Sequence, residues 1–248
     1  MMNNYSILAV ETSTLACSVA LTVKGQMYQR YEHLPQKHAL RLLEMVDEVL
    51  GEAKIKGSEV DVLAYGEGPG AFTGVRIAAG VVQGLSLGWD KPVIGVSSLE
   101  AMAERVLSEM VTSNKISNLV EIPWCALMDA RMKEVYIQSG SFNVNTKAWK
   151  ASEVCLVSPE EARARLESLK ANCIGLGDVV TEYPCLTQRF STWVDTQPSA
   201  MAVVQLVQRM DLECESAYQP LALPVYLRNH VADTIQERLE NRLKKHRG

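Results

Sequence analysis

The spacing of apolar residues alternates between two periods along the first hundred residues, and each period predicts a different element. Runs in which every residue or every second residue is apolar predict β-strands, and apolar residues three and four apart predict helices that cover a sheet. The predicted strands are 7–11, 17–23, 27–33, 60–65 and 92–96, and the predicted helices are 38–50, 73–88 and 97–110. This order predicts a mixed sheet with helices on its faces.

The same plan partly repeats after a polar link at residues 112–118. Strands are expected at 124–128 and 133–142, separated by a turn, and another at 173–176. Ser158, Pro159 and Glu161 combine the N-cap, first-turn proline and capping glutamate of a helix start, and an apolar helix is expected at 199–210. Two halves that each run from strands into helices predict a duplicated α/β architecture, although no repeat is visible residue by residue.

Composition and charge narrow the class of protein. The 47% hydrophobic and 22% charged content of the 248 residues is that of a soluble globular protein. A net charge of −4 argues against a protein that binds nucleic acid alone, because such binding needs a basic surface. The first apolar run, 7–10, is too short for a signal peptide or a membrane span. The six cysteines include no C-x-x-C pair, so we expect a cytoplasmic protein without a zinc or disulfide framework.

The first candidate for chemistry is the turn after the first strand. Glu11, Thr12 and Ser13 place an acid and two hydroxyls where actin-like ATPases approach nucleotide phosphates. The alternative is a β-hairpin whose hydroxyls bond their own backbone.

The second candidate is the glycine-rich run 66–76, which includes Gly68 and Gly70. It lacks the lysine of a Walker A loop. An anion at the start of the following helix and a purely structural turn both remain open. With Glu11, Thr12 and Ser13, these glycines are the candidates for a vestigial phosphate loop.

The helix at 73–88 carries a third signal. Arg76, Gly80, Gly84 and Gly88 recur every four residues and therefore lie along one face. Each interior glycine costs about 1 kcal/mol relative to alanine, which suggests that another backbone comes close. That approach is either internal, against the sheet, or external, against a partner.

The neighbouring helix at 38–50 offers a second docking element. Together, the two helices predict a partner interface formed by His38, Leu42, Met45, Arg76, Gly80 and Gly84. His38 has a simpler interpretation as an exposed or capping residue.

Hydrolytic and metal-binding motifs are missing from the sequence. It has no H-E-x-x-H, no G-x-S-x-G and no metal-ligand spacing among its four histidines. Asp129 and Arg131 are expected to pair locally within a turn. The charged tail has Ile235, Leu239 and Leu243 at helical spacing and cations at 244–247. This pattern indicates either a solvated helix end or an RNA-phosphate contact.

Several stretches together resemble the TsaB (YeaZ) family. The resemblance rests on ILAVETS at 7–13 with ACSVAL at 16–21, AYGEGPGAFTGVRI at 64–77, GVSSL at 95–99, MDAR at 128–131 with EVY at 134–136, and PVYLRN at 224–229. Glu11 stands where many relatives have Asp, and Ala71 where many have Ser. Both differences weaken the nucleotide interpretation.

The resemblance implies an α/β fold of two ribonuclease H-like subdomains from the actin-like ATPase (ASKHA) superfamily. The first subdomain is expected to be 1–112 with about 216–248, and the smaller second one 113–215. The family implies a non-catalytic scaffold that acts with the catalytic subunit TsaD and the ATPase TsaE. This machinery uses ATP to form threonylcarbamoyladenosine beside the anticodon of tRNAs reading codons that begin with A. It also implies a homodimer when the protein is alone, only indirect contact with tRNA, no membrane association and no cofactor of its own.

Two alternatives remain. An ATP-dependent phosphotransferase on the same fold would need an adenosine pocket in the second half, for which 175–178 is a faint candidate. A peptidase would need the metal ligands or nucleophile motif that the sequence lacks.

Overall fold

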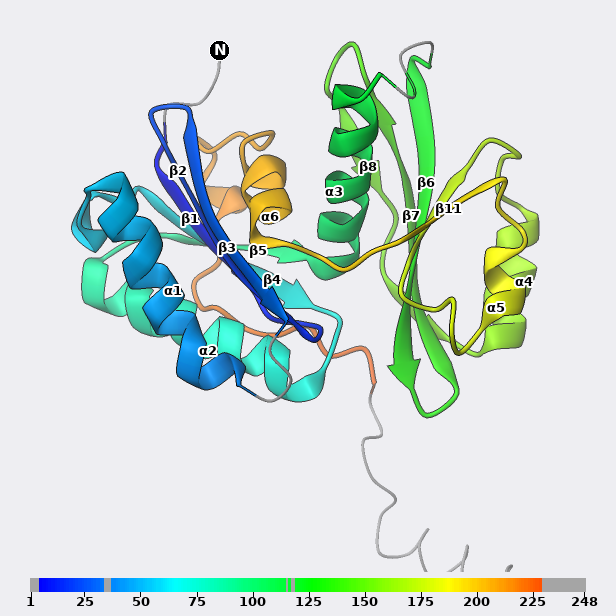
Figure 1. Cartoon of the computed structure of the whole chain (residues 1–248), viewed down its shortest axis with the longest axis horizontal. Helices are drawn as coiled ribbons and strands as arrows, with labels where there is room; N and C mark the ends of the chain where they lie inside the picture. Colours follow the sequence, from blue (N-terminus) through cyan, green and yellow to red (C-terminus); the bar gives the residue numbers. More distant parts are fainter. Residues whose placement is uncertain (1–4, 34–36, 115, 117–118, 229–248) are drawn as a thin grey trace, which may run out of the picture.

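The computed structural model describes residues 5–33, 37–114, 116 and 119–228, which form two β-sheets standing side by side (Figure 1). The first sheet contains β1 (Ile7–Glu11), β2 (Ala16–Val23), β3 (Gln26–His33), β4 (Val62–Gly68) and β5 (Val93–Ser97). Its order is β3-β2-β1-β4-β5. The first strand is antiparallel to the second and parallel to the fourth, so it lies at the centre.

The second sheet has the same plan. It contains β6 (Glu121–Arg131), β7 (Glu134–Asn143), β8 (Trp149–Ala151), β9 (Cys155–Val157), β10 (Ile174–Gly177) and β11 (Thr192–Asp195). Its order is β11-β10-β6-β7-β8, and β9 also pairs with β7. Here too the first strand, β6, is central: it is antiparallel to β7 and parallel to β10. The predicted duplication is therefore present in the topology, without any need for residue-level repetition.

Helices cover both faces of the first sheet. The helices α1 (His38–Ala53) and α2 (Phe72–Trp89) pack on one face, and α6 (Ala200–Val207) packs on the other. The alternation of β1 divides its side chains between two cores: Leu8 and Val10 face α1 and α2, whereas Ile7 and Ala9 face α6. A strand buried on both faces explains the continuous apolar run seen in the sequence.

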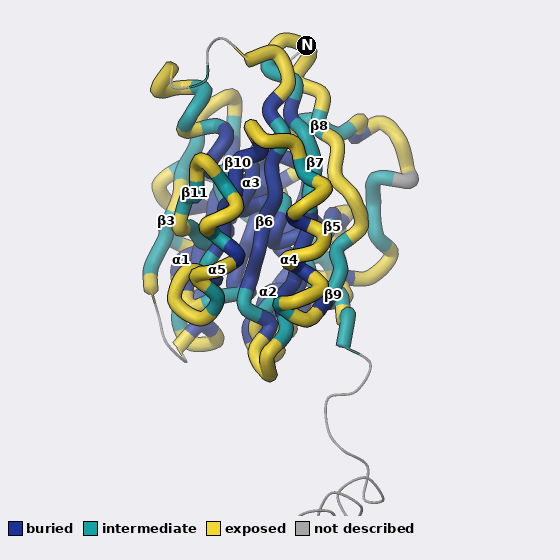
Figure 2. Tube along the Cα trace, turned by 90° about the vertical axis from the view of Figure 1, so that its right-hand side faces the viewer, coloured by how far each residue is buried: buried dark blue, intermediate teal, exposed yellow. Residues whose placement is uncertain are grey.

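The second sheet is also covered on both faces. The helix α3 (Ser98–Thr112) lies between the two sheets and buries Leu99, Met102 and Val106 with Trp124 of β6. On the outer face lie α4 (Pro159–Glu167) and α5 (Pro184–Thr187). Figure 2 shows β6 as a buried strand behind the exposed outer surface of these two helices. Two short 3-10 turns, Gly57–Glu59 and Glu215–Ala217, complete the described elements.

Serine caps begin three of the helices, as side-chain acceptors for otherwise unpaired backbone N–H groups. Ser97, Ser158 and Ser199 each accept a bond from the N–H three residues later, at 3.5, 3.1 and 3.3 Å. The predicted stop at Gly51 is wrong, because α1 continues to Ala53 and ends at Lys54 in the left-handed conformation. Among the described residues, none of the helices has the length and apolar character needed to cross a membrane.

The packing does not follow the subdomain boundaries drawn from the sequence. The helix α6 falls inside the predicted second unit, 113–215, yet it packs on β1, β2 and β4 of the first sheet. We therefore propose assigning residues 200–207 to the first subdomain. Residues 219–226 run beside the first sheet, where Gln219 pairs with Val93 and the Ala222 N–H donates to Gln83 at 2.8 Å. The predicted helical tail with its cations, 229–248, lies outside the described residues.

Candidate functional site: a docking face and an adjoining cleft

The helix α2 presents a row of glycines to solvent. Gly80, Gly84 and Gly88 are exposed, and a Cβ atom built on any of them meets no described atom within 4 Å outside the backbone of α2 itself. Gly74, nearer the start of the same helix, differs because a Cβ there would lie 2.0 Å from the Thr12 carbonyl oxygen. The internal approach that the sequence left open therefore applies to Gly74 but not to the other three. These three leave room for a backbone approaching from outside the chain.

Large apolar side chains are exposed on α2 and on its neighbour α1. Leu87 of α2 is 76% exposed, and Leu40 and Leu43 of the adjacent α1 are 78% and 50% exposed. The two helices run over the same face of the first sheet (Figure 1). We call the surface formed by Leu40, Leu43, Gly80, Gly84 and Leu87 the docking face. It combines exposed apolar area with space for close backbone contact, which is typical of protein–protein interaction surfaces.

Three residues predicted for the interface lie inside the chain instead. Leu42 and Met45 are 0% exposed and belong to the core between α1 and the first sheet. His38 is 7% exposed, and its Nε2 lies 3.3 Å from the Ala16 carbonyl oxygen. The interface prediction is corrected on these three residues, because the apolar stripe of α1 faces its own sheet. The large apolar side chains that α1 exposes are Leu40 and Leu43.

Arg76 is exposed near the start of α2, next to the docking face. Its guanidinium lies 3.6 Å from the centroid of the Phe72 ring, a cation–π contact. Its Nε donates a hydrogen bond to the Tyr226 hydroxyl at 2.6 Å. Sequence reasoning noticed 224–229 only through the family resemblance and missed this contact. No periodic or motif signal connects Tyr226 to a helix 150 residues earlier.

The two loops proposed as a phosphate site come together and interlock. Thr12 Oγ1 donates to the Gly74 carbonyl oxygen at 2.8 Å, and the Ala71 N–H donates to the Ser13 carbonyl oxygen at 2.7 Å. A Cβ on Gly70 would lie 2.4 Å from that same oxygen of Ser13. The glycines thus allow the strand-to-helix loop to lie directly on the first turn. Contacts within the chain occupy the backbone groups named here.

Glu11 and Gly68 also have internal roles. The Glu11 side chain is 1% exposed; its Oε1 accepts from the Ser13 N–H at 2.5 Å, and its Oε2 accepts from Ser98 Oγ at 2.8 Å. Burial raises the pKa of this carboxyl above its usual value, although its hydrogen bonds oppose that shift. Gly68 is buried at the end of β4 with φ +105°, a backbone conformation that favours glycine.

A cleft of about 320 Å³ adjoins these loops and separates the two halves of the molecule. Residues from both halves line it, including Ser13, Gly70, Phe72, Asp129, Asp178 and Tyr226. Ser13 Oγ is buried and has no hydrogen-bond partner within the described part of the chain. The cleft therefore joins the first candidate turn to the faint candidate at 175–178, which the sequence could not place in space.

The two acidic residues of the cleft, Asp129 and Asp178, both have partners within the chain. Asp129 Oδ2 pairs with Arg131 at 3.0 Å, which confirms the predicted local pair. Asp178 Oδ1 accepts from the Asp129 N–H at 2.9 Å. Burial raises the pKa of Asp178 from 3.8 to about 6, although the hydrogen bond from the Asp129 N–H opposes this rise. Across residues 5–228, where described, no three His, Cys, Asp or Glu side chains gather as metal ligands.

The two sheets, with the same strand order and a cleft between them, define a protein of two ribonuclease H-like subdomains, the class of the actin-like ATPase superfamily. A family model described as "TsaD: tRNA N6-adenosine threonylcarbamoyltransferase" matches residues 32–235. The tRNA threonylcarbamoyladenosine biosynthesis protein TsaB of Haemophilus influenzae is 36% identical over 93% of this chain and 96% of its own length. The chain belongs to the TsaB (YeaZ) family.

Other relatives agree with this assignment. The protein of the same name from Escherichia coli is 34% identical over 91% of this chain and 96% of its own length. The solved structure of YeaZ from Pseudomonas aeruginosa covers 90% of this chain and 100% of its own, at 34% identity and a TM-score of 0.72. The match therefore extends over both subdomains, not over one conserved motif.

Proposed function

We propose that this chain is a non-catalytic subunit of the machinery that forms threonylcarbamoyladenosine in tRNA, and that its docking face binds a TsaD-like catalytic subunit. Its relatives are named for threonylcarbamoyladenosine biosynthesis. A TsaE-like ATPase, consuming ATP, completes the machinery, which modifies the adenosine beside the anticodon of tRNAs reading codons that begin with A. This chain reaches tRNA through its partners, in keeping with its net charge of −4.

The observation that carries the docking proposal is the outward row of glycines. Gly80 and Gly84 lie in the interior of an 18-residue helix, where glycine weakens the helix by about 1 kcal/mol per residue. Apart from the α2 backbone itself, no atom of the described residues lies within 4 Å of the positions that their Cβ atoms would take. A partner helix can approach the α2 backbone there, while Leu40, Leu43 and Leu87 bury apolar area against it.

The internal roles of the phosphate-loop candidates support a non-catalytic subunit. The Glu11 carboxyl holds Ser13 and Ser98, and Thr12 holds the α2 loop. These residues connect the turn after β1 to the starts of α2 and α3, so we assign them a structural role. A phosphotransferase would have to bind its nucleotide in the cleft while the Glu11 carboxyl and the Thr12 hydroxyl remain hydrogen-bonded within the chain.

The same docking face also provides a surface for a homodimer when the partner is absent. A second copy would bring an identical pair of helices against the glycine row, as a two-fold interface requires. The homodimer and the complex with the TsaD-like subunit would then compete for one surface.

The decisive experiment is size-exclusion chromatography with light scattering on the wild type and on Gly84→Arg, each alone and mixed with the cognate TsaD-like subunit. Ala164→Arg is the matched control, because Ala164 is an exposed small residue on α4, far along the chain from the docking face. We expect the wild type and Ala164→Arg to form the heterodimer at micromolar concentration, and Gly84→Arg to remain folded and unbound.

Other outcomes refute the proposal in distinct ways. A heterodimer that survives Gly84→Arg places the interface elsewhere. The absence of any complex with wild-type protein removes the scaffold function itself. Turnover of ATP by the isolated wild-type chain would then favour the phosphotransferase.

A further inference from the structure

Residues 219–228 cross from the first subdomain to the second, and we call this segment the strap. It is drawn in orange in Figure 1, where it runs from the first sheet toward the turn between β6 and β7. Its last four residues, 225–228, line the cleft between the subdomains. The strap therefore forms part of the cleft wall while it spans both halves of the molecule. The proposed scaffold function does not use this crossing.

The first end of the strap is fixed to the first subdomain. The Leu223 N–H donates to the Tyr65 hydroxyl at 2.8 Å, and the Tyr65 side chain is completely buried in β4. Further along, the Tyr226 hydroxyl accepts a hydrogen bond from Arg76 at the start of α2. The chain therefore reaches residue 226 as part of the first subdomain.

Arg228 attaches the second end of the strap to the second subdomain. Its Nε donates to Glu134 Oε2 at 3.0 Å, and its Nη2 donates to the carbonyl oxygens of Ala130 and Arg131 at 3.1 and 3.3 Å. Beside it, Leu227 packs against the core between α3 and the second sheet. The polar bonds named here all come from one side chain, so one residue can release this end.

The ion pair of Arg228 with Glu134 is open to solvent in part. Their side chains are 18% and 36% exposed. Dissolved ions screen a partly exposed pair, because the Debye length is only about 8 Å at physiological ionic strength and shorter at higher salt. The strength of this attachment therefore depends on the ionic strength.

The turn that receives Arg228 is strained. Arg131, Met132 and Lys133 have φ values of 61°, 54° and 61°, in the left-handed region that residues other than glycine rarely adopt in succession. The bonds from Arg228 to the carbonyl oxygens of residues 130 and 131 help to hold this conformation. When Arg228 leaves, the turn can relax, and this gain favours the released state.

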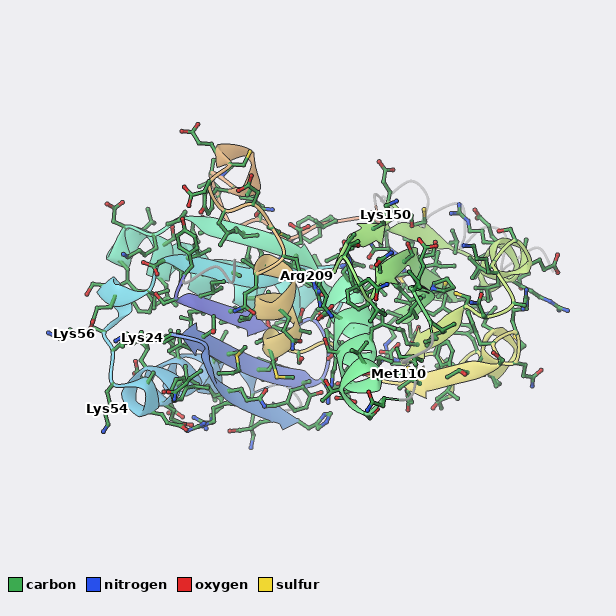
Figure 3. All side chains as sticks on the ribbon, turned by 90° about the horizontal axis from the view of Figure 1, so that it is seen from above. Lys24, Lys54, Lys56, Met110, Lys150 and Arg209 are labelled. Carbon is green, nitrogen blue, oxygen red and sulfur yellow. The ribbon has the colours of Figure 1, made fainter. Side chains whose placement is uncertain are left out.

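The subdomains also meet at a second place, where α3 packs against α6 of the first subdomain and β6 of the second. Glu104 of α3 is 0% exposed there, and its Oε1 accepts from Arg209 Nη2 and from Ser108 Oγ at 2.6 Å. Figure 3 shows Arg209 beside α6, facing the junction of the two halves. Breaking a buried ion pair is costly, so this join stays intact. Relative motion of the subdomains would therefore separate them on the side of the strap.

We propose that the strap holds the two subdomains closed over the cleft and that Arg228 is its releasable end. With Arg228 bound, the cleft has a volume of about 320 Å³. When Arg228 is released, the second subdomain turns about the join between α3 and α6, and the cleft widens. Salt favours the open form because it weakens the pair with Glu134. This device belongs to the chain itself and does not depend on a partner at the docking face.

The test is double electron–electron resonance between two spin labels, one on each subdomain, in the isolated full chain. Ser58→Cys and Ala164→Cys provide the labelling sites, because both residues are small and exposed. Cys155, Cys185 and Cys214 are replaced by serine, whereas the other three cysteines are buried and stay. The measured quantity is the distribution of distances between the labels.

Variants at the second end of the strap should open the cleft. Arg228→Ala should add a longer distance and raise the ratio of open to closed chains about tenfold or more, because hydrogen bonds of a charged group are lost. Glu134→Gln keeps the shape of the acceptor without its charge and should open the cleft less. Arg189→Ala is the matched control, because Arg189 donates to the Leu169 carbonyl oxygen at 3.2 Å within the second subdomain. It should keep the wild-type distribution.

Ionic strength gives a second readout. Raising the salt concentration from about 0.05 M to about 1 M should shift the wild type toward the longer distance. The same change should leave the distributions of Arg228→Ala and Glu134→Gln unaltered, since both lack the ion pair. Circular dichroism checks that each variant folds, and Glu134→Gln decides the question if Arg228→Ala does not.

Three results would overturn the inference. An unchanged distribution in Arg228→Ala and Glu134→Gln would show that the join between α3 and α6 alone fixes the subdomains. A longer distance in Arg189→Ala as well would indicate general loosening of the second subdomain. An equal response to salt in the wild type and in the strap variants would show that the pair of Arg228 with Glu134 is not the releasable contact.

Discussion

Replacing Gly84 by alanine tests whether the glycine row is retained for an external partner. A Cβ at Gly84 meets no atom within 4 Å, so alanine introduces no clash. Alanine in a helix interior is about 1 kcal/mol more favourable than glycine, because glycine loses more backbone entropy on folding. For a domain of this size, that gain corresponds to a rise in Tm of about 2–4 °C. We therefore expect Gly84→Ala to stabilise the isolated chain.

Gly74→Ala is the matched control in the same helix. There the Cβ would lie 2.0 Å from the Thr12 carbonyl oxygen, so the loop and the first turn must separate. Forcing atoms into occupied space costs about 1–3 kcal/mol, which exceeds the gain in helix propensity. We expect Gly74→Ala to lower the Tm. Differential scanning calorimetry of the two variants and the wild type measures both shifts.

Partner binding completes the test. If a partner backbone occupies the space beside Gly84, the added methyl group must weaken the complex while it stabilises the free chain. A lower Tm for Gly84→Ala would refute the structural premise that the position is open. A higher Tm with undiminished affinity for the TsaD-like subunit would instead refute the docking role of this glycine.

Three further perturbations follow from the contacts. Leu42→Ala should lower the free energy of unfolding by about 2–5 kcal/mol because Leu42 is fully buried, whereas Leu40→Ala should change it by less than about 0.5 kcal/mol; urea titration measures both. Because the pKa of Asp178 is 3.8 unfolded and about 6 folded, the unfolded chain releases this proton first as pH rises. Between pH 3.8 and about pH 6, the free energy of unfolding of the wild type should therefore fall by up to about 3 kcal/mol relative to that of Asp178→Asn, and below pH 3.8 the two should not diverge. Urea titration at several pH values measures both, and equal pH profiles would contradict this expectation. Arg228→Ala removes the hydrogen bonds to Glu134 and to two backbone carbonyls, so amide hydrogen exchange at residues 222–228 should accelerate. Unchanged protection would show that the remaining contacts hold this segment in place without Arg228.

The order of elements was predictable because local patterns determine it. Strands buried on both faces produced continuous apolar runs, and the cap at Ser158 marked the start of α4. The placement of α6 was not predictable in this way. Six of its eight residues are buried, so its apolar pattern shows that it is covered without showing by which sheet. That choice depends on contacts between distant parts of the chain.

The sequence predicted a partner interface on α1 and α2, but the three residues that it named on α1 lie in the core. Leucines occur on both sides of this helix, and only packing shows that Leu42 faces the sheet while Leu40 and Leu43 face solvent. On α2, the four-residue spacing of glycines correctly indicated one face. Its direction could not be predicted, because glycine has no side chain whose polarity would indicate inside or outside. The space around each Cβ position decided the question.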